Sequence, residues 1–589
     1  MPHPYEAPVS LMRLCLDQAA RTAGAHEIEG YVDSIADVAT PVLDSASRFA
    51  GEVLSPLNAI GDRDHSRIEN GRVLTPTGFP EAYRRFREDG WVSLGAPTEY
   101  GGQGLPGLLA VATSEMWAGA NMAFAMCPEL AVGAMESLRT HAPRALCDEY
   151  LPRIASGEWT SSMCLTEPQA GSDLSTLRTR AEPDGEGWRL FGRKIYISWG
   201  DHDLSDNIVH FVLARTPEAP PGLKGISLFL VPKKIRGPGG EFQSNDIHAV
   251  SLEHKMGIHA SPTCVMALGE KDGARGWLVG KRHEGLACMF TIMNHMRIGV
   301  GVHSLGLAER ALQLARHHAR ERLQGRDALG AQRPIIEHAD VRRMLMMMKC
   351  LTHAVRCLTY TAAATVDVAH SGRTEESRAS AARRADLLTP IVKAWGSDIG
   401  VEVASLGVQI HGGTGYIDDA EISQVYRDAR IGPIFEGTNY IQAQDLLGRK
   451  IVRDRGASLN ELLCDIEAAA LKLPPEPSHP LVGLRWGLLE GSEGFRKAMA
   501  KVIDRAATDK ELVGSVAYEC LTWLGVLAGG WQWAISASDA LARGDRGETP
   551  GIIETAAFYG KRVLPRVRMH EAAVRSGSAP VTAVPQSDL

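Results

Sequence analysis

Apolar residues recur at helical spacing through the first 158 residues of the chain. In VDSIADVATPVLDSASRFAGEVL (32–54) they return at every third or fourth position, and stretches rich in Gly and Pro, such as GAPTEYGGQGLP (95–106), separate the segments. This spacing places apolar side chains on one face of a helix, and Gly and Pro interrupt helices. The pattern therefore predicts an N-terminal helical domain over 1–158.

Strand-length patterns replace the helical spacing in the middle of the chain. GWRLFGRKIYIS (187–198), IVHFVLAR (208–215) and GISLFLVPK (225–233) alternate or run apolar and end at turn residues. Alternation with period two is typical of strands that bury one face, and continuous apolar runs are typical of strands that bury both. We therefore predict a β domain, a barrel or a sandwich, over 159–284.

Helical spacing returns after 285 and continues almost to the end of the chain. Long segments such as SLGLAERALQLARHHARERLQ (304–324) carry apolar stripes that suit a helical bundle over 285–455. The proline-rich stretch LPPEPSHPL (473–481) is typical of a linker, and the region 456–589 that contains it is predicted to be a further helical domain. The predicted fold class is mainly α with a central β domain.

Formal charge at pH 7 is −7, from 63 Lys and Arg against 70 Asp and Glu in 589 residues. So small an excess favours neither nucleic acid nor an anionic membrane as the main partner, because both are bound through clustered positive charge. The first residues lack the basic start and apolar run of a signal peptide, and no later run is expected to cross a bilayer. We expect a soluble enzyme without stable membrane insertion.

Ten cysteines are scattered from Cys15 to Cys520 without a CxxC pair or a His/Cys cluster in the sequence. A disulfide framework or a zinc site normally shows such spacing. The cysteines are therefore predicted to be reduced, packed thiols with no metal, which favours a cytoplasmic location.

A single carboxylate, Glu436, stands among apolar residues and glycine in PIFEGTNYIQ (433–442). Backbone amides rather than water would solvate its charge, and burial raises the pKa of a carboxyl group toward neutrality. Glu436 is therefore a candidate general base. The alternative is that it caps a helix beginning near Thr438, where the helix dipole favours a negative charge.

The longer stretch YRDARIGPIFEGTNYIQ (426–442) resembles the signature of the acyl-CoA dehydrogenase family, and the resemblance extends over about residues 35–575. The order of the regions is similar to that of the longer bacterial members, which carry a C-terminal helical extension. The resemblance implies the acyl-CoA dehydrogenase fold: an N-terminal helical domain, a middle β-barrel and a C-terminal four-helix bundle, here followed by an extra helical domain.

The resemblance also implies a reaction. An FAD-dependent oxidoreductase of fatty acid β-oxidation would convert an acyl-CoA to the trans-2-enoyl-CoA, with Glu436 removing the α-hydrogen as the β-hydride moves to the flavin. Electrons would pass to electron-transfer flavoprotein. Flavin contacts shared across an interface imply at least a homodimer, and a tetramer stays open.

The string CLTEPQAGSD (164–173) matches the family turn that binds the flavin ring, and KIYIS (194–198) matches the strand that packs on it. A flavin needs hydrogen-bond donors around its ring to stabilise the reduced form. Taken alone, the first string is an ordinary polar turn and the second an ordinary barrel strand. The matching positions imply that the FAD-binding residues here are Met163, Leu165, Thr166, Ser172, Tyr196 and Ser198.

Two further strings match family segments that reach the phosphates and the adenosine of the flavin across a dimer interface, RERLQGR (320–326) and QIHGGTGY (409–416). An arginine can fork onto a phosphate, although in a basic helix it is usually solvated. Glycines allow close backbone approach, although an isolated GGxG is weak evidence. The FAD-binding residues implied by the resemblance in this region are Arg322, Gln409, Gly412, Gly413 and Thr438.

NHMRIG (294–299) resembles the family segment that lines the acyl-CoA site. Some relatives place their catalytic Glu on this helix, but His295 and Met296 cannot serve as a carboxylate base, which leaves Glu436. The substrate-binding residues implied are Ser172, Arg297 and Gly437.

Two other functions remain open. Acyl-CoA oxidases and flavin monooxygenases of the same fold use oxygen as the acceptor, and some members with a C-terminal extension are non-catalytic and bind DNA. The extension 456–589 holds 14 Lys and Arg against 16 Asp and Glu, which disfavours DNA because duplex binding needs a basic face. The extension is instead expected to pack on the catalytic helices or a partner subunit through Trp523, Trp531 and Trp533.

Overall fold

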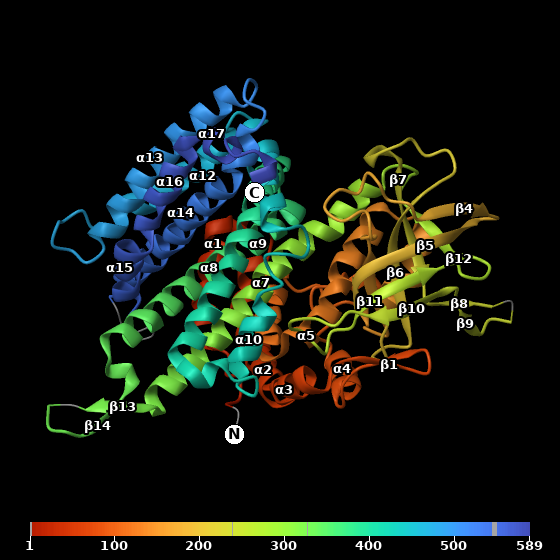
Figure 1. The fold of residues 1–589 in the computed structure, drawn as a ribbon, viewed down its shortest axis with the longest axis horizontal. Helices are drawn as coiled ribbons and strands as arrows, with labels where there is room; N and C mark the ends of the chain where they lie inside the picture. Colours follow the sequence, from red (N-terminus) through yellow and green to blue (C-terminus); the bar gives the residue numbers. More distant parts are fainter. Residues whose placement is uncertain (1–2, 238, 327, 545–550, 589) are drawn as a thin grey trace. The chain divides into compact units, whose positions relative to one another are not determined.

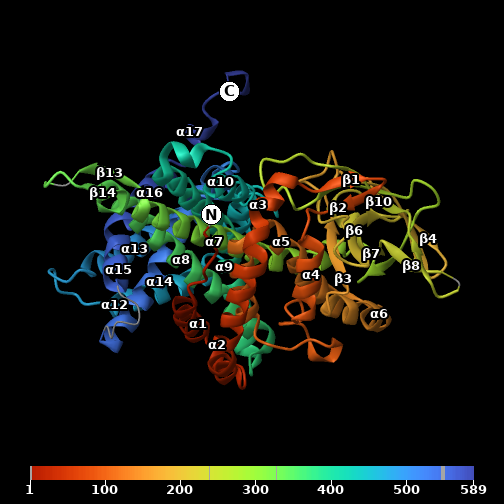
Figure 2. The ribbon, with the colours of Figure 1, turned by 90° about the horizontal axis from the view of Figure 1, so that it is seen from below.

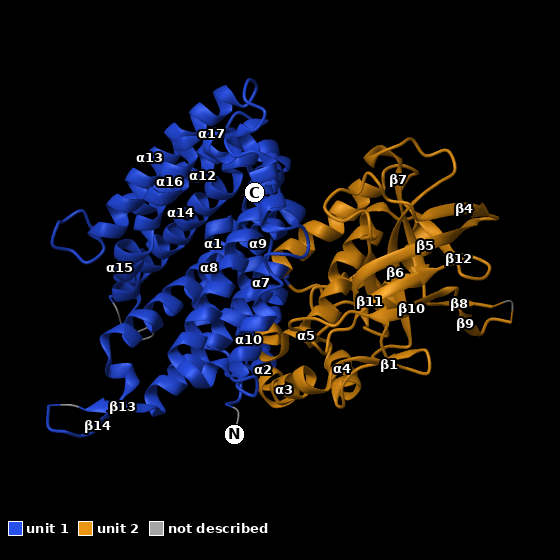
Figure 3. Ribbon diagram, viewed as in Figure 1, with its two compact units in different colours: residues 1–47, 106–115, 300–589 blue, residues 48–105, 116–299 orange. Residues whose placement is uncertain are grey.

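The chain forms two compact units in the computed structural model, which describes residues 3–237, 239–326, 328–544 and 551–588 (Figure 3). The helical unit comprises 1–47, 106–115 and 300–589, and the β unit comprises 48–105 and 116–299. The division falls within three helices, α2 (Tyr31–Phe49), α5 (Gly107–His141) and α7 (Gly285–Glu321).

The N-terminal part of the β unit is helical, as predicted, and it encloses an aromatic cluster. Its elements are α3 (Ser55–Asp64), β1 (Arg67–Glu69), β2 (Arg72–Leu74), α4 (Phe79–Glu88), most of α5, and α6 (Arg144–Ala155). The rings of Phe49 and Phe86 lie 5.7 Å apart, and the rings of Phe86 and Trp117 lie 5.3 Å apart, both edge to face. Such edge-to-face pairs add to the stabilisation that burial itself provides.

An eight-stranded sheet follows and forms the centre of the β unit (Figure 1). Its strands are β3 (Trp159–Cys164), β4 (Arg180–Asp184), β5 (Gly187–Ser198), β6 (Asn207–Arg215), β7 (Ile226–Pro232), β10 (Ile247–Leu252), β11 (Thr263–Leu268) and β12 (Ala274–Val279). The strands β5, β12, β7, β6 and β4 pair in a closed circuit, so the sheet forms a barrel. A separate hairpin pairs β8 (Lys234–Arg236) with β9 (Phe242–Ser244).

The barrel is closed around apolar side chains from several strands. Leu190, Val212, Phe229 and Cys264 are 0% exposed, and every residue of β7 is buried. Complete burial of one Leu or Phe side chain contributes about 1.5–3 kcal/mol to folding. The continuous apolar runs of the sequence are therefore strands with both faces covered.

Long and short helices packed on one another form the helical unit. They are α1 (Val9–Ala23), α2, most of α7, α8 (Ala339–Ser371), α9 (Glu375–His411), α10 (Glu421–Ala429) and α11 (Asn439–Gln444), with the hairpin β13 (Leu323–Arg326) and β14 (Gln332–Pro334) between α7 and α8. Thr374 and Ser377 form a capping box that starts α9. Inside the bundle, buried Arg356 donates to Glu115 and Glu309 at 2.6 and 2.7 Å.

The C-terminal extension is helical, as predicted, and packs on the bundle (Figures 1 and 2). Its helices are α12 (Ala457–Leu471), α13 (Val482–Arg505), α14 (Leu512–Arg543), α15 (Ile552–Arg562), α16 (Val567–Ser576) and α17 (Ala579–Thr582). The central helix α14 contacts α8, α9 and α11, and it buries Trp523, Trp531 and Trp533 almost completely. Of the two expected placements, the structure shows packing of the extension on the helices of 285–455.

One expectation about the extension was wrong. Among the described helices, α14 is long and apolar enough to cross a membrane by length and composition, although the sequence was expected to hold no such run. In the structure 67% of its most apolar window is buried. The core helix of a soluble protein passes the same test, so this composition is weak evidence for a membrane span.

Small residues on α14 allow a close approach of α9. A Cβ atom added at Gly525 would lie 2.4 Å from Cγ of Trp395, which is far inside van der Waals contact. We expect Gly525→Ala to destabilise the protein by about 1–3 kcal/mol, because overpacking forces the indole to move. Thermal unfolding measures the effect. Gly483→Ala on α13, where the nearest atom is 3.6 Å away, should leave stability unchanged or slightly higher, and equal effects would contradict this packing.

Candidate active site

Glu436 lies in an irregular segment between α10 and α11 and has an unusual backbone. Its φ is +57° and that of Gly437 is +81°, so two successive residues are left-handed. For a residue with a side chain this conformation costs about 1–3 kcal/mol and persists only where surrounding contacts impose it. The half-buried carboxylate is therefore presented by a strained turn.

The helix that follows is capped by another residue. Thr438 is the N-cap of α11, and its hydroxyl accepts a hydrogen bond from the backbone N–H of Ile441 at 3.3 Å. The alternative role of Glu436 as the cap is therefore not what the structure shows. The side chain of Gln442 donates to the backbone oxygen of Gly437 at 3.2 Å, which connects the turn to α11.

Asn439 anchors this turn to α9 through its buried side chain. Its amide nitrogen donates to the backbone oxygen of Ala394 at 3.1 Å and to Asp398 at 2.8 Å, while its amide oxygen accepts from Lys393 at 2.9 Å. Its backbone N–H donates to the oxygen of Pro433 at 3.0 Å, across the turn. These bonds fix both ends of the segment that carries Glu436, and such bonding stabilises the left-handed geometry.

The anchor continues into the C-terminal extension. Tyr518 on α14 donates its hydroxyl to Asp398 at 2.8 Å, and Asp398 accepts from Asn439 with its other oxygen. Burial raises the pKa of Asp398, and burial and then the neighbouring carboxylate raise the pKa of Tyr518. Tyr518 of the extension thus supports the turn that carries Glu436, because Asp398 bonds to both Tyr518 and Asn439.

The turn predicted to bind the flavin ring begins in the β unit where β3 ends, and a buried ion pair holds it. Glu167 is 4% exposed and accepts from Lys194, which is 0% exposed, at 2.8 Å. Lys194 also donates to the backbone oxygen of Leu165 at 3.1 Å, and Glu167 accepts from the backbone N–H of Thr179 at 3.0 Å. The pair therefore fixes the path of the backbone at Leu165 and Thr166.

The charges of this pair depend on each other. Burial opposes ionisation of Glu167, but the neighbouring Lys194 ammonium and the hydrogen bonds outweigh burial and lower the pKa of Glu167 to about 2. Burial lowers the pKa of Lys194, and Glu167 limits that shift. Because an unfolded Glu has a pKa of about 4.3, the ionised carboxylate contributes stability above that pH, and the contribution is lost as the pH falls through 2.

Tyr196 leaves the extended conformation of β5 at a β-bulge. Its φ is +59°, its side chain is 61% exposed, and the register between β5 and β11 shifts beside it. A bulge re-aims a side chain and is common next to active sites, so Tyr196 is not an ordinary residue of a barrel wall. The backbone N–H of Ile195 donates to the oxygen of Thr166 at 3.0 Å, which brings this bulge and the 164–173 turn together.

The other predicted residues of the β unit differ in exposure. Met163 lies in β3 and Ser198 at the end of β5, both half-buried, and Ser172 is exposed in the turn. Arg297 on α7 is buried, donates to Asn294 at 3.3 Å and lies over the ring of Phe290 at 5.8 Å. These residues and the bulge belong to the β unit, whereas Glu436, Gly437 and Thr438 belong to the helical unit.

The predicted phosphate and adenosine residues lie together in the helical unit. Arg322 follows the last residue of α7 and is exposed, as is Gln409 in the last turn of α9. The rings of His318 and His411 stack at 4.3 Å and connect these two helix ends. Burial, and then His411, lowers the pKa of His318 to about 4, so that both rings can stack in the neutral form.

The glycine-rich turn after α9 is open. A Cβ atom at Gly412 or Gly413 would meet nothing within 4 Å, and Gly412 has a φ of +62°. His411 donates from Nδ1 to the backbone oxygen of Gly407 at 2.8 Å, so this ring is hydrogen-bonded within its own helix. A ligand or another chain can therefore approach this backbone closely.

The supporting residues were not predicted from the sequence. Glu167 stands within the motif 164–173 and Asn439 within 433–442, but neither was assigned a role. A carboxylate within the predicted flavin-binding motif and an amide just after the candidate base are both visible in the sequence. Their partners Lys194, Lys393 and Asp398 are identified only when the fold brings the segments together.

Family models match the chain in four consecutive segments. They are the acyl-CoA dehydrogenase N-terminal domain (40–158), its middle domain (162–270), its C-terminal domain (283–451) and an acetyl-CoA dehydrogenase C-terminal-like domain (464–585). The fold and the site define an FAD-dependent oxidoreductase. The chain belongs to the acyl-CoA dehydrogenase family.

Individual relatives match nearly the whole chain. It is 43% identical over 571 residues to 3-methylmercaptopropionyl-CoA dehydrogenase of Ruegeria pomeroyi, over 95% of this chain and 96% of the relative. It is 33% identical to a broad-specificity linear acyl-CoA dehydrogenase of Mycobacterium tuberculosis over 91% of both chains. In fold it is similar to an acyl-CoA dehydrogenase of Bacillus anthracis solved with FAD, with a TM-score of 0.75 and 21% identity over 91% of this chain and 88% of that one.

Each unit presents side chains and backbone of a kind that can bind FAD. The β unit presents an exposed aromatic ring at Tyr196 beside the half-buried hydroxyl of Thr166, on a backbone fixed by an ion pair. The helical unit presents an exposed guanidinium at Arg322 and an open turn at Gly412, which suit phosphates and a ribose. The roles of the individual residues stay predictions.

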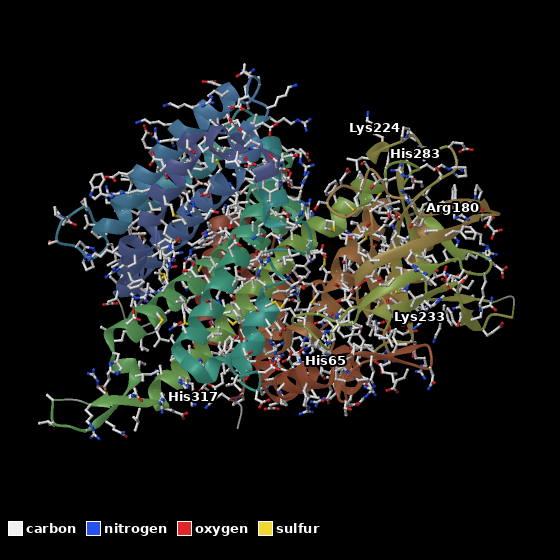
Figure 4. All side chains as sticks on the ribbon, viewed as in Figure 1. His65, Arg180, Lys224, Lys233, His283 and His317 are labelled. Carbon is white, nitrogen blue, oxygen red and sulfur yellow. The ribbon has the colours of Figure 1, made fainter. Side chains whose placement is uncertain are left out.

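Removing the ammonium of Lys194 should disturb the flavin turn. Lys194→Met leaves Glu167 buried without its charged partner, so we expect the β unit to lose about 3–5 kcal/mol of stability and the protein to retain less FAD. Urea unfolding and the flavin absorbance per chain measure both effects. Lys224→Met, at an exposed position of the same unit (Figure 4), is the control, and similar results for the two variants would contradict the role of the ion pair.

Proposed function

We propose that this protein oxidises an acyl-CoA thioester at its α and β carbons to the trans-2-enoyl-CoA, with Glu436 as the general base. The observation that carries the proposal is the left-handed turn at Glu436, which buried hydrogen bonds hold in place. Thr438 caps α11, so the Glu436 carboxylate is not needed as the helix cap. A strained and externally fixed carboxylate is typical of a catalytic position. Membership of the acyl-CoA dehydrogenase family supports the reaction class.

The chain's own groups would divide the chemistry between a base and a hydrogen-bond donor. The Glu436 carboxylate takes the α-proton of the thioester, and the backbone N–H of Glu436 donates to the thioester oxygen as negative charge develops there. A fixed donor aimed at a developing oxyanion stabilises the transition state because it does not need to reorganise. The electron pair of the broken α-C–H bond becomes the new C=C bond as the β-hydrogen leaves as hydride.

Bound FAD supplies the acceptor of that hydride. In the β unit the residues proposed to hold it are Met163, Leu165, Thr166, Ser172, Tyr196 and Ser198. In the helical unit they are Arg322, Gln409, Gly412, Gly413 and Thr438. Ser172, Arg297 and Gly437 are proposed to contact the acyl-CoA.

The names of the relatives support a short or thioether acyl group. The relative that is 43% identical is named for 3-methylmercaptopropionyl-CoA, and a relative that is 35% identical over 76% of this chain is a butyryl-CoA dehydrogenase of Syntrophomonas wolfei. A thioether sulfur replaces a methylene at similar size and is easily accommodated in an apolar pocket. We therefore propose a short acyl-CoA, with a linear or a thioether chain, as the substrate class.

We further propose electron-transfer flavoprotein as the acceptor, a homodimer as the assembly and the cytoplasm as the location. Exposed apolar side chains support the dimer, because water-exposed apolar groups next to predicted cofactor residues are typical of an interface. Leu329 is 94% exposed beside the β13–β14 hairpin, and Tyr416 and Ile417 are 87% and 56% exposed after the glycine turn. Hydrogen peroxide released in proportion to product would instead support an oxidase.

Replacing the proposed base should abolish most turnover without removing the cofactor. We expect Glu436→Gln to retain FAD and the fold, and to lower kcat by roughly 10² to 10⁴, the range for loss of a general base. Turnover with butyryl-CoA and 3-methylmercaptopropionyl-CoA, in the presence of an artificial electron acceptor, measures the effect. Glu376→Gln, at an exposed position at the start of α9, is the matched control, and normal turnover of Glu436→Gln would refute the assignment.

A further inference from the structure

Two cysteines and a histidine that are far apart in the sequence meet inside the helical unit. His353 and Cys357 are four residues apart on one face of α8, and Cys15 on α1 faces them. All are buried, with Cys357 0%, Cys15 1% and His353 5% exposed. The sequence shows no His/Cys cluster because 338 residues separate Cys15 from His353, so only the packing of α1 on α8 forms this group.

The two sulfurs and one imidazole nitrogen lie within 4.8 Å of one another, close enough to share one metal ion. The two sulfurs lie 3.4 Å apart, Cys357 Sγ lies 3.5 Å from His353 Nε2, and Cys15 Sγ lies 3.9 Å from His353 Nδ1. Bond lengths of about 2.3 Å to sulfur and 2.05 Å to nitrogen place tetrahedral ligands about 3.8 Å (S to S) and 3.6 Å (S to N) apart. The separation of the two sulfurs and that of Cys15 Sγ from Nδ1 lie within about 0.4 Å of these values. The 3.5 Å from Cys357 Sγ is to the other ring nitrogen, and it shows that this thiol lies against the same imidazole.

A second set of residues orients the imidazole. Ser536 on α14 lies with its hydroxyl 3.0 Å from His353 Nε2, and it donates to the side-chain oxygen of Gln18 at 2.7 Å. Trp533 packs against the imidazole with ring centroids 4.2 Å apart. Metal-binding histidines generally use their second nitrogen in a hydrogen bond of this kind. With Nε2 bonded to Ser536, Nδ1 is the nitrogen that faces Cys15.

A cavity borders the cluster at His353. Its volume is about 490 Å³, and His353 lines it together with Thr352, Trp533 and the N-terminal residues 7–11. An ion or a water molecule can therefore reach the imidazole, which gives both a route of entry and space for one further ligand. A buried site without a route of entry could not exchange its metal.

We propose that Cys15, Cys357 and His353 bind one thiophilic closed-shell cation, zinc(II) or copper(I), which links α1 to the helical bundle beside the C-terminal extension. Soft thiolates select these ions over magnesium or calcium. On binding, one cation replaces the two thiol protons, and neither the metal nor the sulfur changes its oxidation state. With zinc(II) the two thiolates and the neutral imidazole make a centre of zero net charge, which suits a buried position.

The protonation of the thiols makes this binding dependent on pH. The hydrogen bond from Cys357, and then burial, raise the pKa of Cys15. Binding of a cation by two thiolates displaces both thiol protons. The affinity for the metal is therefore expected to fall as the pH is lowered.

Metal content of the full-length flavoprotein tests this proposal directly. Chelator-treated, reduced protein is loaded anaerobically with zinc(II) or with copper(I), desalted and analysed by mass spectrometry for metal per chain. We expect about one equivalent per chain of either zinc(II) or copper(I). The ion that gives this content is the one that the site binds. Cobalt(II) in place of zinc should give a sulfur-to-cobalt charge-transfer band in the near ultraviolet.

Variants identify the ligands. Cys15→Ser and Cys357→Ser should lose the bound metal and the cobalt band, and Ser536→Ala should weaken binding roughly 10- to 100-fold. Cys350→Ser is the matched control, since Cys350 is buried on the same helix seven residues earlier and outside the cluster. Circular dichroism and FAD content confirm that each variant is folded.

Three outcomes would overturn the proposal. The first is wild-type protein that binds neither ion, and the second is metal retained by Cys357→Ser as fully as by Cys350→Ser. The third is a Cys15–Cys357 disulfide in the purified protein, which peptide mapping after alkylation would detect.

Discussion

The left-handed backbone at Glu436 is the constraint on which the proposed chemistry depends. A side-chain-bearing residue at this φ costs about 1–3 kcal/mol, and each buried hydrogen bond that holds it contributes about 0.5–1.5 kcal/mol. Asn439 supplies several such bonds to α9, through Lys393 and Asp398, and Tyr518 of the extension bonds to Asp398 in turn. The extension is therefore part of the support of the turn that carries the proposed base.

In the β unit a buried ion pair holds the backbone of the turn that is predicted to bind the flavin. Buried pairs such as Glu167 and Lys194 often add little net stability, because removing two charges from water offsets their attraction. Here the pair fixes the position of the backbone, since Lys194 donates hydrogen bonds to both Glu167 and the backbone oxygen of Leu165. Two polar anchors in two units thus fix the backbone at the proposed base and at the proposed cofactor contacts.

Periodicity and motifs predicted the helices, the barrel and the family, because burial dictates the spacing of apolar residues locally. The anchors were not predictable, since Asn439 and Glu167 acquire their roles from partners such as Tyr518 and Lys194 that are distant in the sequence. The φ of Glu436 was also hidden, because no residue type other than glycine signals it. The sequence analysis also missed that α14 is long and apolar enough to cross a membrane, because a helix buried inside a protein and a helix buried in lipid have similar apolar compositions.

The most direct test of the central claim is an anaerobic titration of the purified flavoprotein with short acyl-CoAs, including butyryl-CoA and 3-methylmercaptopropionyl-CoA. The absorbance of the oxidised flavin is followed as each thioester is added. The account predicts that one or more of these thioesters bleaches the flavin while the matching trans-2-enoyl-CoA forms. Flavin that stays fully oxidised with every thioester, although each binds, would contradict it.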